Sequence, residues 1–541
     1  MKASRAVLVL AAILFICNIW GYDLWAPDEP FYGEGAREMI ADGQWLVSHV
    51  NGEFDDDKPP AYFWLIALLS LPFAEVSSFT ARLPSVLAAF GTVALTLWLG
   101  LRWSSERTAV LAALILATTY MFWDKARSVQ PDMVLCFLIW IALAAFEAWR
   151  TGDTDGRRAG MVFWFALAFS VLVKWPVGLA IAGAIVFFTL LWDRELKRGW
   201  EFAPVLGAVV VITMFCAWAY STSIWGPPGY SAWGAFYRHF ISRAVSGIHH
   251  AQPWWYYAKV LPTQLLPWTF VVPGAAALAL WRRDKNDRFL LVAITFVLVL
   301  FSVSTEKRTL YVLPTFPAFA LMIARFLGAA FGWEEAPSFS RRWITIGQGL
   351  FGALLVLLGV AAPFAANRAG VESFSGWMFW ALGLLVLSGG IAALVGVFRR
   401  DLRTAVLAPA ICFALVYVFI ASVVYPAAND FKSAKKMALV IKEETAQSRA
   451  TGHEVLAVNV GNLYEAYNFF SDGVYFFRTN DMDDVARHFD QEPRVFAVVD
   501  SRLLAELPPH IQERMETIAT HDGSRRLVAL VANRPPKASE E

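Results

Sequence analysis

Charged residues are scarce in this chain of 541 residues: they make up 17% of it, whereas hydrophobic residues make up 57%. Soluble globular proteins have about 25% charged residues, so this composition excludes an ordinary soluble fold for most of the chain and predicts a membrane protein. The charges also balance, with 46 basic and 45 acidic residues and a formal net charge of +1. Such a balance gives no general attraction to nucleic acid, and we expect no nucleic-acid partner.

Cysteine is scarce as well. The four cysteines all lie in apolar runs, and the polar carboxyl-terminal region has none. This excludes a disulfide framework and a zinc site built from cysteines. Aromatic residues, in contrast, are abundant, with 24 tryptophans and 42 phenylalanines. They suit interfacial belts, and they also suit platforms that stack against sugars or prenyl chains.

Long apolar runs divide most of the chain into candidate membrane spans. The first run, residues 6–20, is interpreted as an anchoring helix, because no small-x-small cleavage pattern follows it. With it, about thirteen runs are long enough to cross roughly 30 Å of hydrocarbon. The other twelve begin near Leu83, Thr108, Met133, Met161, Pro176, Phe202, Leu261, Phe289, Tyr311, Trp343, Trp377 and Ala405.

The expected fold is mainly α, with a polytopic transmembrane helical domain over residues 1–425 that carries catalytic outer loops at 21–60 and 221–258. From residue 426 the composition becomes that of a soluble protein, in which strand-like runs alternate with helical patterns. Residues 426–541 are therefore predicted to form a small extracytoplasmic α/β domain. The strand-like runs are 455–460, 474–477, 495–499 and 527–531, and the helical patterns are 433–444 and 481–489.

Basic residues gather in alternate connections between the spans, for example Arg102 with Arg107, and Arg399 with Arg400. The positive-inside rule places these connections in the cytoplasm. The long segments 21–60 and 221–258, and everything after residue 425, then face the outside. We expect a multi-pass protein of the inner (plasma) membrane whose active site and carboxyl-terminal domain are periplasmic.

The first outer loop is the densest functional candidate. Asp28 and Glu29 precede a proline at the start of an amphipathic helix that carries Tyr32 and Arg37. Taken alone, this pattern is equally typical of an N-cap with an acid in the first turn. A second acidic cluster, which ends in Asp57 and is followed by Lys58, favours a functional site at this interface.

The same outer side carries Asp132, Lys174, Arg243 and His239. Each alone is typical of an interfacial charge, because long cationic side chains near helix ends reach headgroups easily. Together they suit a lipid-linked phosphate, which cations would hold as charge develops on it. A carboxylate would deprotonate an acceptor hydroxyl or hold a divalent metal ion, whose candidate ligands are Asp57 and His239.

Several motifs resemble those of a known family. They are DEPFYGEGAREM at 28–39, NGEFDDDKPPAYFW at 51–64, ARLPS at 81–85, ARSVQPD at 126–132, VLVKWPVGL at 171–179, PWWYY at 253–257 and STEKRTLYVLP at 304–314. Their sequence and spacing resemble the polytopic glycosyltransferases of the C superfamily, in the branch that includes protein O-mannosyltransferases and the lipid A aminoarabinose transferase. The likeness covers nearly the whole membrane region.

The resemblance implies a role for particular residues. Asp28 would be at the catalytic centre with Glu29 supporting it, and Asp132, in the family's second acidic turn, would be a third catalytic residue. Lys58 and Arg243 match residues that hold the lipid phosphate.

Other positions depart from the family pattern. Phe31 stands where the family usually has a phosphate-binding arginine, for which Arg37 or Lys174 would compensate. Trp175 replaces the glycine of the family's KGP turn. The donor cavity is expected to be lined by Tyr311, from the YILP-like element, and by Tyr32.

The function implied is transfer of a sugar from a polyprenyl-phosphate donor to lipid A or another envelope glycan, by a single inverting displacement. The partners are then the donor, a lipid or glycan acceptor and membrane lipids. A protein O-mannosyltransferase is the alternative, since it shares the DE motif. A lipid or sugar transporter is less favoured, because its charges would lie near the middle of the bilayer rather than at one face.

Overall fold

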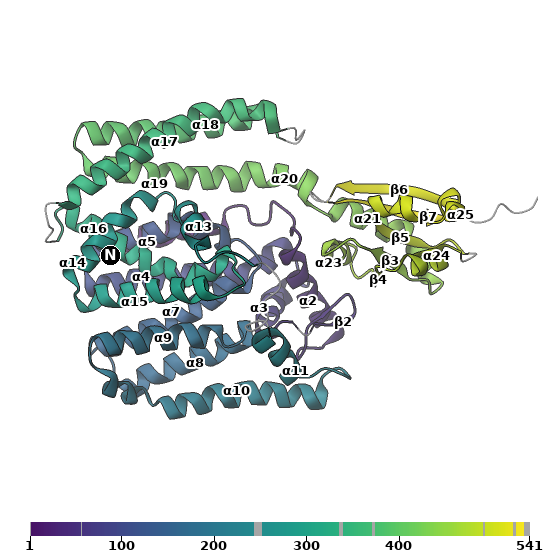
Figure 1. The fold of residues 1–541 in the computed structure, drawn as a ribbon, viewed down its shortest axis with the longest axis horizontal. Helices are drawn as coiled ribbons and strands as arrows, with labels where there is room; N and C mark the ends of the chain where they lie inside the picture. The colour runs from purple at the N-terminus through teal and green to yellow at the C-terminus, as the bar shows by residue number, and fades with distance from the viewer. Residues whose placement is uncertain are drawn as a thin grey trace, which may run out of the picture. The chain divides into compact units, whose positions relative to one another are not determined.

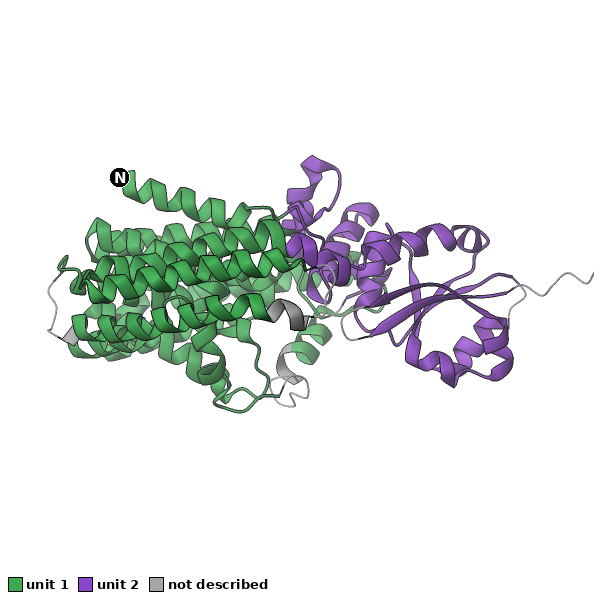
Figure 2. Cartoon of the chain, turned by 90° about the horizontal axis from the view of Figure 1, so that it is seen from above, with its two compact units in different colours: residues 1–19, 56–62, 82–424 green, residues 20–55, 63–81, 425–541 purple. Residues whose placement is uncertain are grey.

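The computed structural model describes residues 2–55, 57–242, 251–334, 339–369, 374–490, 493–522 and 526–534. The chain forms two units, coloured separately in Figure 2. The first unit consists of Met1–Ile19, Asp56–Tyr62 and Arg82–Val424, and the second of Trp20–Asp55, Phe63–Ala81 and Tyr425–Glu541. The second unit thus contains parts of the first outer loop as well as the carboxyl-terminal region. The division at residue 425 that we expect from composition stays a prediction.

The first unit is helical because its apolar segments can satisfy their backbone hydrogen bonds internally only as helices in lipid. Helices α17, α18 and α19 pack in sequence, as Figure 1 shows, and α8 packs between α7 and α10. The helices are α1 (Lys2–Ile16), α4 (Ser78–Trp103), α5 (Glu106–Thr118), α6 (Tyr120–Ala126), α7 (Pro131–Arg150), α8 (Gly156–Lys174), α9 (Val177–Trp192), α10 (Pro204–Trp225), α11 (Ala232–Phe236), α13 (Tyr256–Gln264), α14 (Val272–Arg282), α15 (Lys285–Val303), α16 (Phe316–Ala330), α17 (Phe339–Ala369), α18 (Gly376–Phe398) and α19 (Leu402–Phe419). Short 3-10 or π-helical segments are η2 (Leu196–Phe202), η3 (Tyr237–Ser242), η4 (Thr269–Val271), η5 (Thr309–Thr315) and η6 (Ile420–Val424).

Within the described residues, nine helices are long and apolar enough to cross a membrane, or up to eleven if each of two bent helix pairs is one span. The chain is therefore a multi-pass membrane protein, but the expected count of about thirteen spans is not confirmed. Helix α9 has 16 residues and α1 has 15, both short for a membrane crossing. An apolar helical segment that we did not count as a span, Ala61–Phe73, follows the first outer loop.

Hydrogen bonds from buried polar side chains fix the helices that carry the candidate site. Trp140 Nε1 in α7 donates to Pro314 O over 2.9 Å, which ties α7 to η5. Arg127, just after α6, is buried and its Nη1 donates to Phe15 O over 3.0 Å at the end of α1. Buried polar groups of this kind cost free energy unless they are paired, so these bonds specify how the helices pack.

The second unit contains a five-stranded sheet in the order β4-β3-β5-β7-β6. Strand β3 pairs in parallel with β4 and β5, while β7 is antiparallel to β5 and β6. Alternate residues of β3 enter different cores: Val455 and Ala457 belong to one, Leu456 and Val458 to the other. The strands are β3 (Val455–Val458), β4 (Phe476–Thr479), β5 (Phe496–Asp500), β6 (Met515–Asp522) and β7 (Leu527–Asn533), so the four expected strands are confirmed and β6 is additional.

Helices cover both faces of this sheet, as expected for parallel strands buried on both sides. Helices α21 (Lys435–Glu444) and α23 (Leu463–Phe470) pack on one face, and α24 (Met482–Phe489) and α25 (Pro509–Arg514) on the other. The unit also contains α20 (Tyr425–Lys432), α22 (Ala446–Ala450) and the 3-10 segment η7 (Ser501–Glu506). The first outer loop contributes α2 (Asp28–Asp42), the strands β1 (His49–Val50) and β2 (Glu53–Phe54), most of α3 (Ala61–Ser70) and η1 (Leu71–Phe73).

The hairpin of β1 and β2 is joined to β4 by one side chain. Asn51 is buried, its Nδ2 donates to Phe476 O over 2.8 Å, and Phe476 N donates to Asn51 Oδ1 over 2.7 Å. The side-chain amide of Asn51 thereby pairs with a backbone N–H and a backbone C=O of the edge strand β4, as the backbone of another strand would. Parts of the first outer loop and the carboxyl-terminal sheet consequently fold as one unit.

Candidate functional site

A cavity of about 220 Å³ in the first unit is lined by both charged and apolar side chains. It collects charged side chains from several segments that are far apart in the sequence. Its wall includes most of the site residues expected in this unit, together with apolar residues of α7, α9 and α15. The lining residues are Asp57, Lys58, Asp132, Leu135, Lys174, Trp175, Val177, Ile181, His239, Phe301, Ser304, Glu306, Leu310, Tyr311 and Pro314.

Lys174 and Asp132 form an ion pair in this cavity. Lys174 Nζ lies 2.6 Å from Asp132 Oδ1, and the ammonium is 5.3 Å from the centre of the Tyr311 ring. Asp132 is in the first turn of α7 and Lys174 is in the last turn of α8. Each charge therefore lies at the helix end whose dipole favours it.

Asp57 is the centre of a second group of charges in the same cavity. Its carboxylate pairs with Lys58, and its Oδ1 lies 2.6 Å from His239 Nδ1. The side chains of Lys58 and Lys174 are 25% and 23% exposed. Two partly accessible ammonium groups thus line one cavity, beside the carboxylates of Asp57, Asp132 and Glu306. Ammonium groups of this kind are donors to phosphate oxygens.

Trp175 determines the local backbone between Lys174 and the start of α9. Its φ of +51° and ψ of −169° lie in a region that is almost exclusive to glycine. The buried ring packs against Trp218 and Phe236, with centroids 6.3 and 5.9 Å away, and its Nε1 donates to Asp57 O over 3.2 Å. Packing and this hydrogen bond hold the strained backbone and link the turn after α8 to the Asp57–Lys58 segment.

The expected metal ligands do not make a convincing metal site. Asp57 and His239 lie together, but Lys58 contacts the same carboxylate. Among the residues that the structure describes, no three His, Cys, Asp or Glu side chains are grouped so that they would hold a metal ion. The donor set fits a network of ion pairs better than a divalent cation.

The other expected residues of the first outer loop belong to the second unit. Asp28 begins α2, and Glu29 Oε2 accepts a hydrogen bond from Trp25 N over 3.1 Å. Glu29 therefore stabilises the turn that leads into α2. Tyr32 is buried against Phe63, with ring centroids 5.3 Å apart. Its role in lining a donor cavity stays a prediction.

Arg37 is engaged with a buried acid. Its Nε and Nη2 donate to the two carboxylate oxygens of Glu34 over 2.8 and 2.6 Å, and Glu34 is fully buried. Gly473 leaves room for the guanidinium, because a Cβ there would lie 3.1 Å from Nη2. These contacts give Arg37 a structural role. Its expected contact with the donor phosphate stays a prediction.

Arg243, expected to hold the donor phosphate, lies outside the described residues. The sequence did not single out Glu306 and Ser304, which line the cavity of Lys58 and Lys174. The signal that was present is their place in the STEKRTLYVLP motif, three and five residues before the helical turn η5, which brings Leu310 and Tyr311 to the same cavity.

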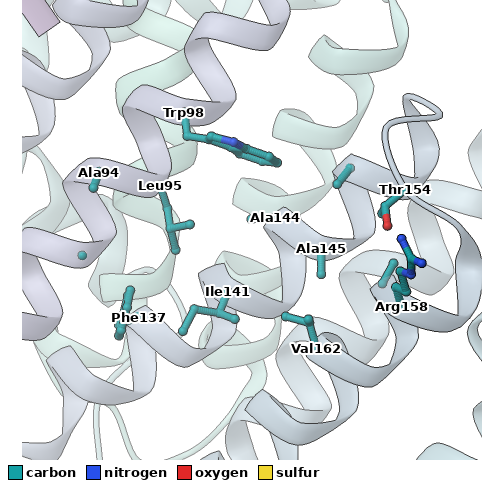
Figure 3. A pocket seen from close by; sticks show the side chains of 13 residues that line it. Ala94, Leu95, Trp98, Phe137, Ile141, Ala144, Ala145, Thr154, Arg158 and Val162 are labelled. Atoms are coloured by element: carbon teal, nitrogen blue, oxygen red, sulfur yellow. The ribbon is translucent and has the colours of Figure 1, made fainter.

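A second cavity of the first unit, of about 620 Å³, is almost entirely apolar. In Figure 3, Trp98 and Leu95 of α4 face Ile141 of α7 and Val162 of α8, while Arg158 lies at one end. Without converging polar groups this cavity cannot carry acid–base chemistry. It suits a hydrocarbon chain instead.

Comparisons with known proteins agree with this description. A family model described as dolichyl-phosphate-mannose-protein mannosyltransferase matches residues 57–220. The undecaprenyl phosphate-alpha-4-amino-4-deoxy-L-arabinose arabinosyl transferase of Pectobacterium carotovorum subsp. carotovorum (strain PC1) is 29% identical over 403 residues, which are 70% of each chain. The protein of the same name from Pseudomonas paraeruginosa is 27% identical and covers 73% of this chain and 71% of its own.

Solved structures show the same fold. ArnT from Cupriavidus metallidurans bound to undecaprenyl phosphate matches with a TM-score of 0.77 and 19% identity over 99% of both chains. An oligosaccharyltransferase from Archaeoglobus fulgidus matches with a TM-score of 0.53 and 12% identity, over 96% of this chain and 72% of that one. The chain is therefore a multi-pass membrane glycosyltransferase that is similar to those of the C superfamily. Within that superfamily it resembles the aminoarabinose transferases, as its sequence motifs indicate.

Proposed function

We propose that this enzyme transfers a sugar, of the aminoarabinose type, from a polyprenyl-phosphate donor to lipid A or another envelope glycan. The observation that carries the proposal is the cavity that contains Lys58 and Lys174 beside the carboxylate of Asp132. It is supported by the names of the relatives, which specify undecaprenyl phosphate and an amino sugar, and by the solved structure of similar fold that binds undecaprenyl phosphate.

The lysines suit the change in charge during the reaction. The donor phosphate is a diester, and when the bond between the anomeric carbon and the phosphate oxygen breaks, the electron pair stays on that oxygen. The departing polyprenyl phosphate thus gains negative charge. Cations that already lie at the phosphate stabilise the transition state more than the ground state, which is the condition for catalysis.

The acceptor oxygen attacks the anomeric carbon from the face opposite the phosphate, so the configuration at that carbon is inverted. If the acceptor is a hydroxyl, its proton passes to Asp28 acting as a general base. If the acceptor is a phosphate of lipid A, its oxygen is already anionic at neutral pH and needs no base. Asp28 then positions the acceptor or the donor sugar.

We further propose that the reaction takes place at the periplasmic face of the inner membrane. Helix α7 begins beside Asp132 and ends at Arg150, whereas α8 begins beside Arg157 and Arg158 and ends at Lys174. The cavity is thus at the end of this helix pair that carries Asp132 and Lys174. The opposite end carries Arg150, Arg157 and Arg158. The positive-inside rule assigns the basic ends to the cytoplasm.

A transfer assay tests the proposal. Purified protein in detergent is incubated with undecaprenyl-phosphate aminoarabinose and lipid A, and the lipid product is measured by mass spectrometry. We expect lipid A to gain the mass of one amino sugar, and we expect Asp28→Asn to abolish the gain while Asp490→Asn, at an exposed position of the second unit, retains it. Absence of the gain with wild-type protein, or full activity of Asp28→Asn, would reject the proposal.

A protein O-mannosyltransferase is the second candidate, because the family model that matches residues 57–220 carries that description. The same assay separates the two functions when a Ser/Thr-rich peptide and a polyprenyl-phosphate mannose replace the acceptor and donor. Mannosylated peptide, without modified lipid A, would favour this alternative.

A further inference from the structure

The second unit contains a polar cavity that the proposed reaction does not use. Its volume is about 550 Å³, within the usual range for small-ligand sites. It lies where the parallel strands β3 and β4 end, because Asn459 follows β3 and Thr479 ends β4. Ligands of open α/β sheets commonly bind outside the carboxyl ends of the strands.

Glu465 is the buried acid of this cavity. The residue is 4% exposed, and its Oε1 accepts a hydrogen bond from Asn462 Nδ2 over 3.2 Å. Its Oε2 makes no close hydrogen bond among the described residues, where its polar neighbour is the Tyr464 hydroxyl, and the side chain lines the cavity. An unsatisfied buried polar atom is costly to the fold, so a bound ligand that makes a hydrogen bond to Oε2 would remove this cost.

Two arginines give the cavity a cationic wall. Arg478 is held by Glu53, with Nη2 and Oε2 2.6 Å apart, and its Nη1 donates to the Tyr464 hydroxyl over 3.0 Å. Arg526 donates to the backbone carbonyl and to Oδ1 of Asn459, the latter over 3.2 Å. Both guanidinium groups are therefore fixed in place and retain further N–H donors, since each has five.

The lining thus combines two kinds of recognition. Guanidinium groups bind phosphate oxygens with directed hydrogen bonds. The side-chain amides of Asn459 and Asn462 and the carboxyl of Glu465 both donate to and accept from hydroxyl groups, while the Tyr464 ring offers a flat apolar surface. Sugars that carry phosphate present both kinds of group.

We propose that this cavity binds a phosphorylated saccharide, which in the proposed function is the polar head of the acceptor. The assignment of the ligand as acceptor rests on that function, whereas the binding of a phosphorylated saccharide does not. The buried carboxyl and the amides contact the sugar hydroxyls. Arg478 and Arg526 contact the phosphate.

Calorimetric titration of the full-length protein in detergent tests this proposal without any donor. The probes are chitobiose phosphate, chitobiose and inorganic phosphate. Wild type should bind chitobiose phosphate at least tenfold more tightly than either of the other two. Equal affinity for inorganic phosphate would show a simple anion site, and no binding of chitobiose phosphate would overturn the proposal outright.

Two variants separate the two kinds of contact. Glu465→Leu should weaken the binding of both chitobiose probes about tenfold, because it removes contacts to hydroxyl groups. Arg478→Gln should weaken only chitobiose phosphate, so that the two chitobiose probes bind alike. Glu443→Leu and Arg494→Gln are the matched controls at exposed positions and should bind as wild type does. Unchanged affinities in both cavity variants would overturn the proposal.

Hydrogen exchange of the wild-type protein gives a readout that does not depend on how a variant folds. Chitobiose phosphate should slow amide exchange in the segments after β3 and β4, and not in β6. Exchange that is unchanged in those two segments would contradict the proposal. If the protein binds chitobiose phosphate but transfers no sugar, the proposed function is rejected and the saccharide site is supported. If it transfers sugar but does not bind chitobiose phosphate, the saccharide site is rejected and the proposed function is supported.

Discussion

Lys174 Nζ lies 2.6 Å from Asp132 Oδ1, at the point where the end of α8 meets the start of α7. The carboxylate holds an ammonium that would otherwise be free to move on its four-carbon stem. Because Asp132 is mostly buried, its contribution is to orient Lys174 toward the cavity that Lys58 also lines. In the proposed function the bound phosphate becomes a second anionic partner of the same ammonium.

A double-mutant cycle on this pair tests whether Asp132 acts through Lys174. We expect Lys174→Met to raise the donor KM by roughly tenfold to a hundredfold, since a hydrogen bond between charged groups contributes about 1.5–3 kcal/mol. Asp132→Asn should have an effect in the wild type and almost none in the Lys174→Met background. Steady-state kinetics of the four proteins measures this. Fully additive effects would instead give Asp132 a direct role in catalysis.

The backbone conformation at Trp175 predicts the order of thermal stability of two variants at this position. Glycine adopts the conformation of residue 175 without strain, whereas alanine retains a strain of about 1–3 kcal/mol. Both variants lose the buried ring and the hydrogen bond to Asp57 O, so both should unfold at lower temperature than wild type. Trp175→Gly should nevertheless be more stable than Trp175→Ala. Thermal unfolding in detergent measures the order, and the reverse order would show that the backbone is not strained.

The ion pair of Arg37 predicts a loss of stability. Arg37→Ala leaves the fully buried carboxylate of Glu34 without its partner, which costs about 3–5 kcal/mol for pairs of this kind. The double variant Arg37→Leu/Glu34→Leu should recover much of this loss, because it removes both charges. Thermal unfolding and donor KM should be measured together. A raised donor KM with unchanged stability would support the phosphate contact expected from the sequence.

The stability of the second unit should depend on the protonation of Glu465. Burial raises the pKa of this carboxyl to about 8, from 4.5, and the nearby acids Asp28 and Asp55 contribute to the rise. Between these pH values the folded state binds more protons than the unfolded state, so stability falls as the pH rises from about 4.5 to about 8 and is level above that.

Glu465→Gln removes this dependence. We expect the variant to lose less thermal stability than wild type between pH 5 and pH 8, and Glu443→Gln, at an exposed position, to follow wild type. Melting curves of the three proteins over this range provide the measurement. Identical pH dependence in wild type and Glu465→Gln would contradict the raised pKa.

The sequence predicts long helices well because lipid demands long apolar segments, but hydropathy does not show where a segment bends. The run that begins near Thr108 is divided between α5 and α6 at an angle of 67°, and α13 and α14 meet at 114°. Tertiary contacts satisfy the backbone groups that such bends expose. Tyr120 N, for example, donates to Leu266 O over 2.9 Å.

In the carboxyl-terminal region, the sequence predicts the buried strands but not the edge strand β6. Strands β3 and β5 are predicted because their residues are buried on both faces and form continuous apolar runs. Strand β6 is at the edge of the sheet and only partly buried, and its sequence METIATHD lacks such a run. It was therefore missed.

The sequence indicated single candidate residues of the site, but most contacts between them could not be predicted from it. The contact of Arg37 with Glu34 follows from helical spacing, because residues three positions apart share a face. The contact of Lys174 with Asp132 joins residues 42 positions apart, and no local pattern specifies it. The hydrogen bond from Trp175 to Asp57 O is likewise set by tertiary folding alone.

In the proposed function, Lys58 and Lys174 together hold the phosphate of a lipid-linked donor. The most direct test is the affinity of the purified protein for undecaprenyl phosphate itself, compared among wild type, Lys58→Ala, Lys174→Ala and the double variant, with Lys436→Ala at an exposed position as the control. We predict that each cavity variant raises the Kd at least tenfold, that the double variant raises it further, and that the control leaves it unchanged. A Kd that is the same in wild type and in the double variant would contradict the claim.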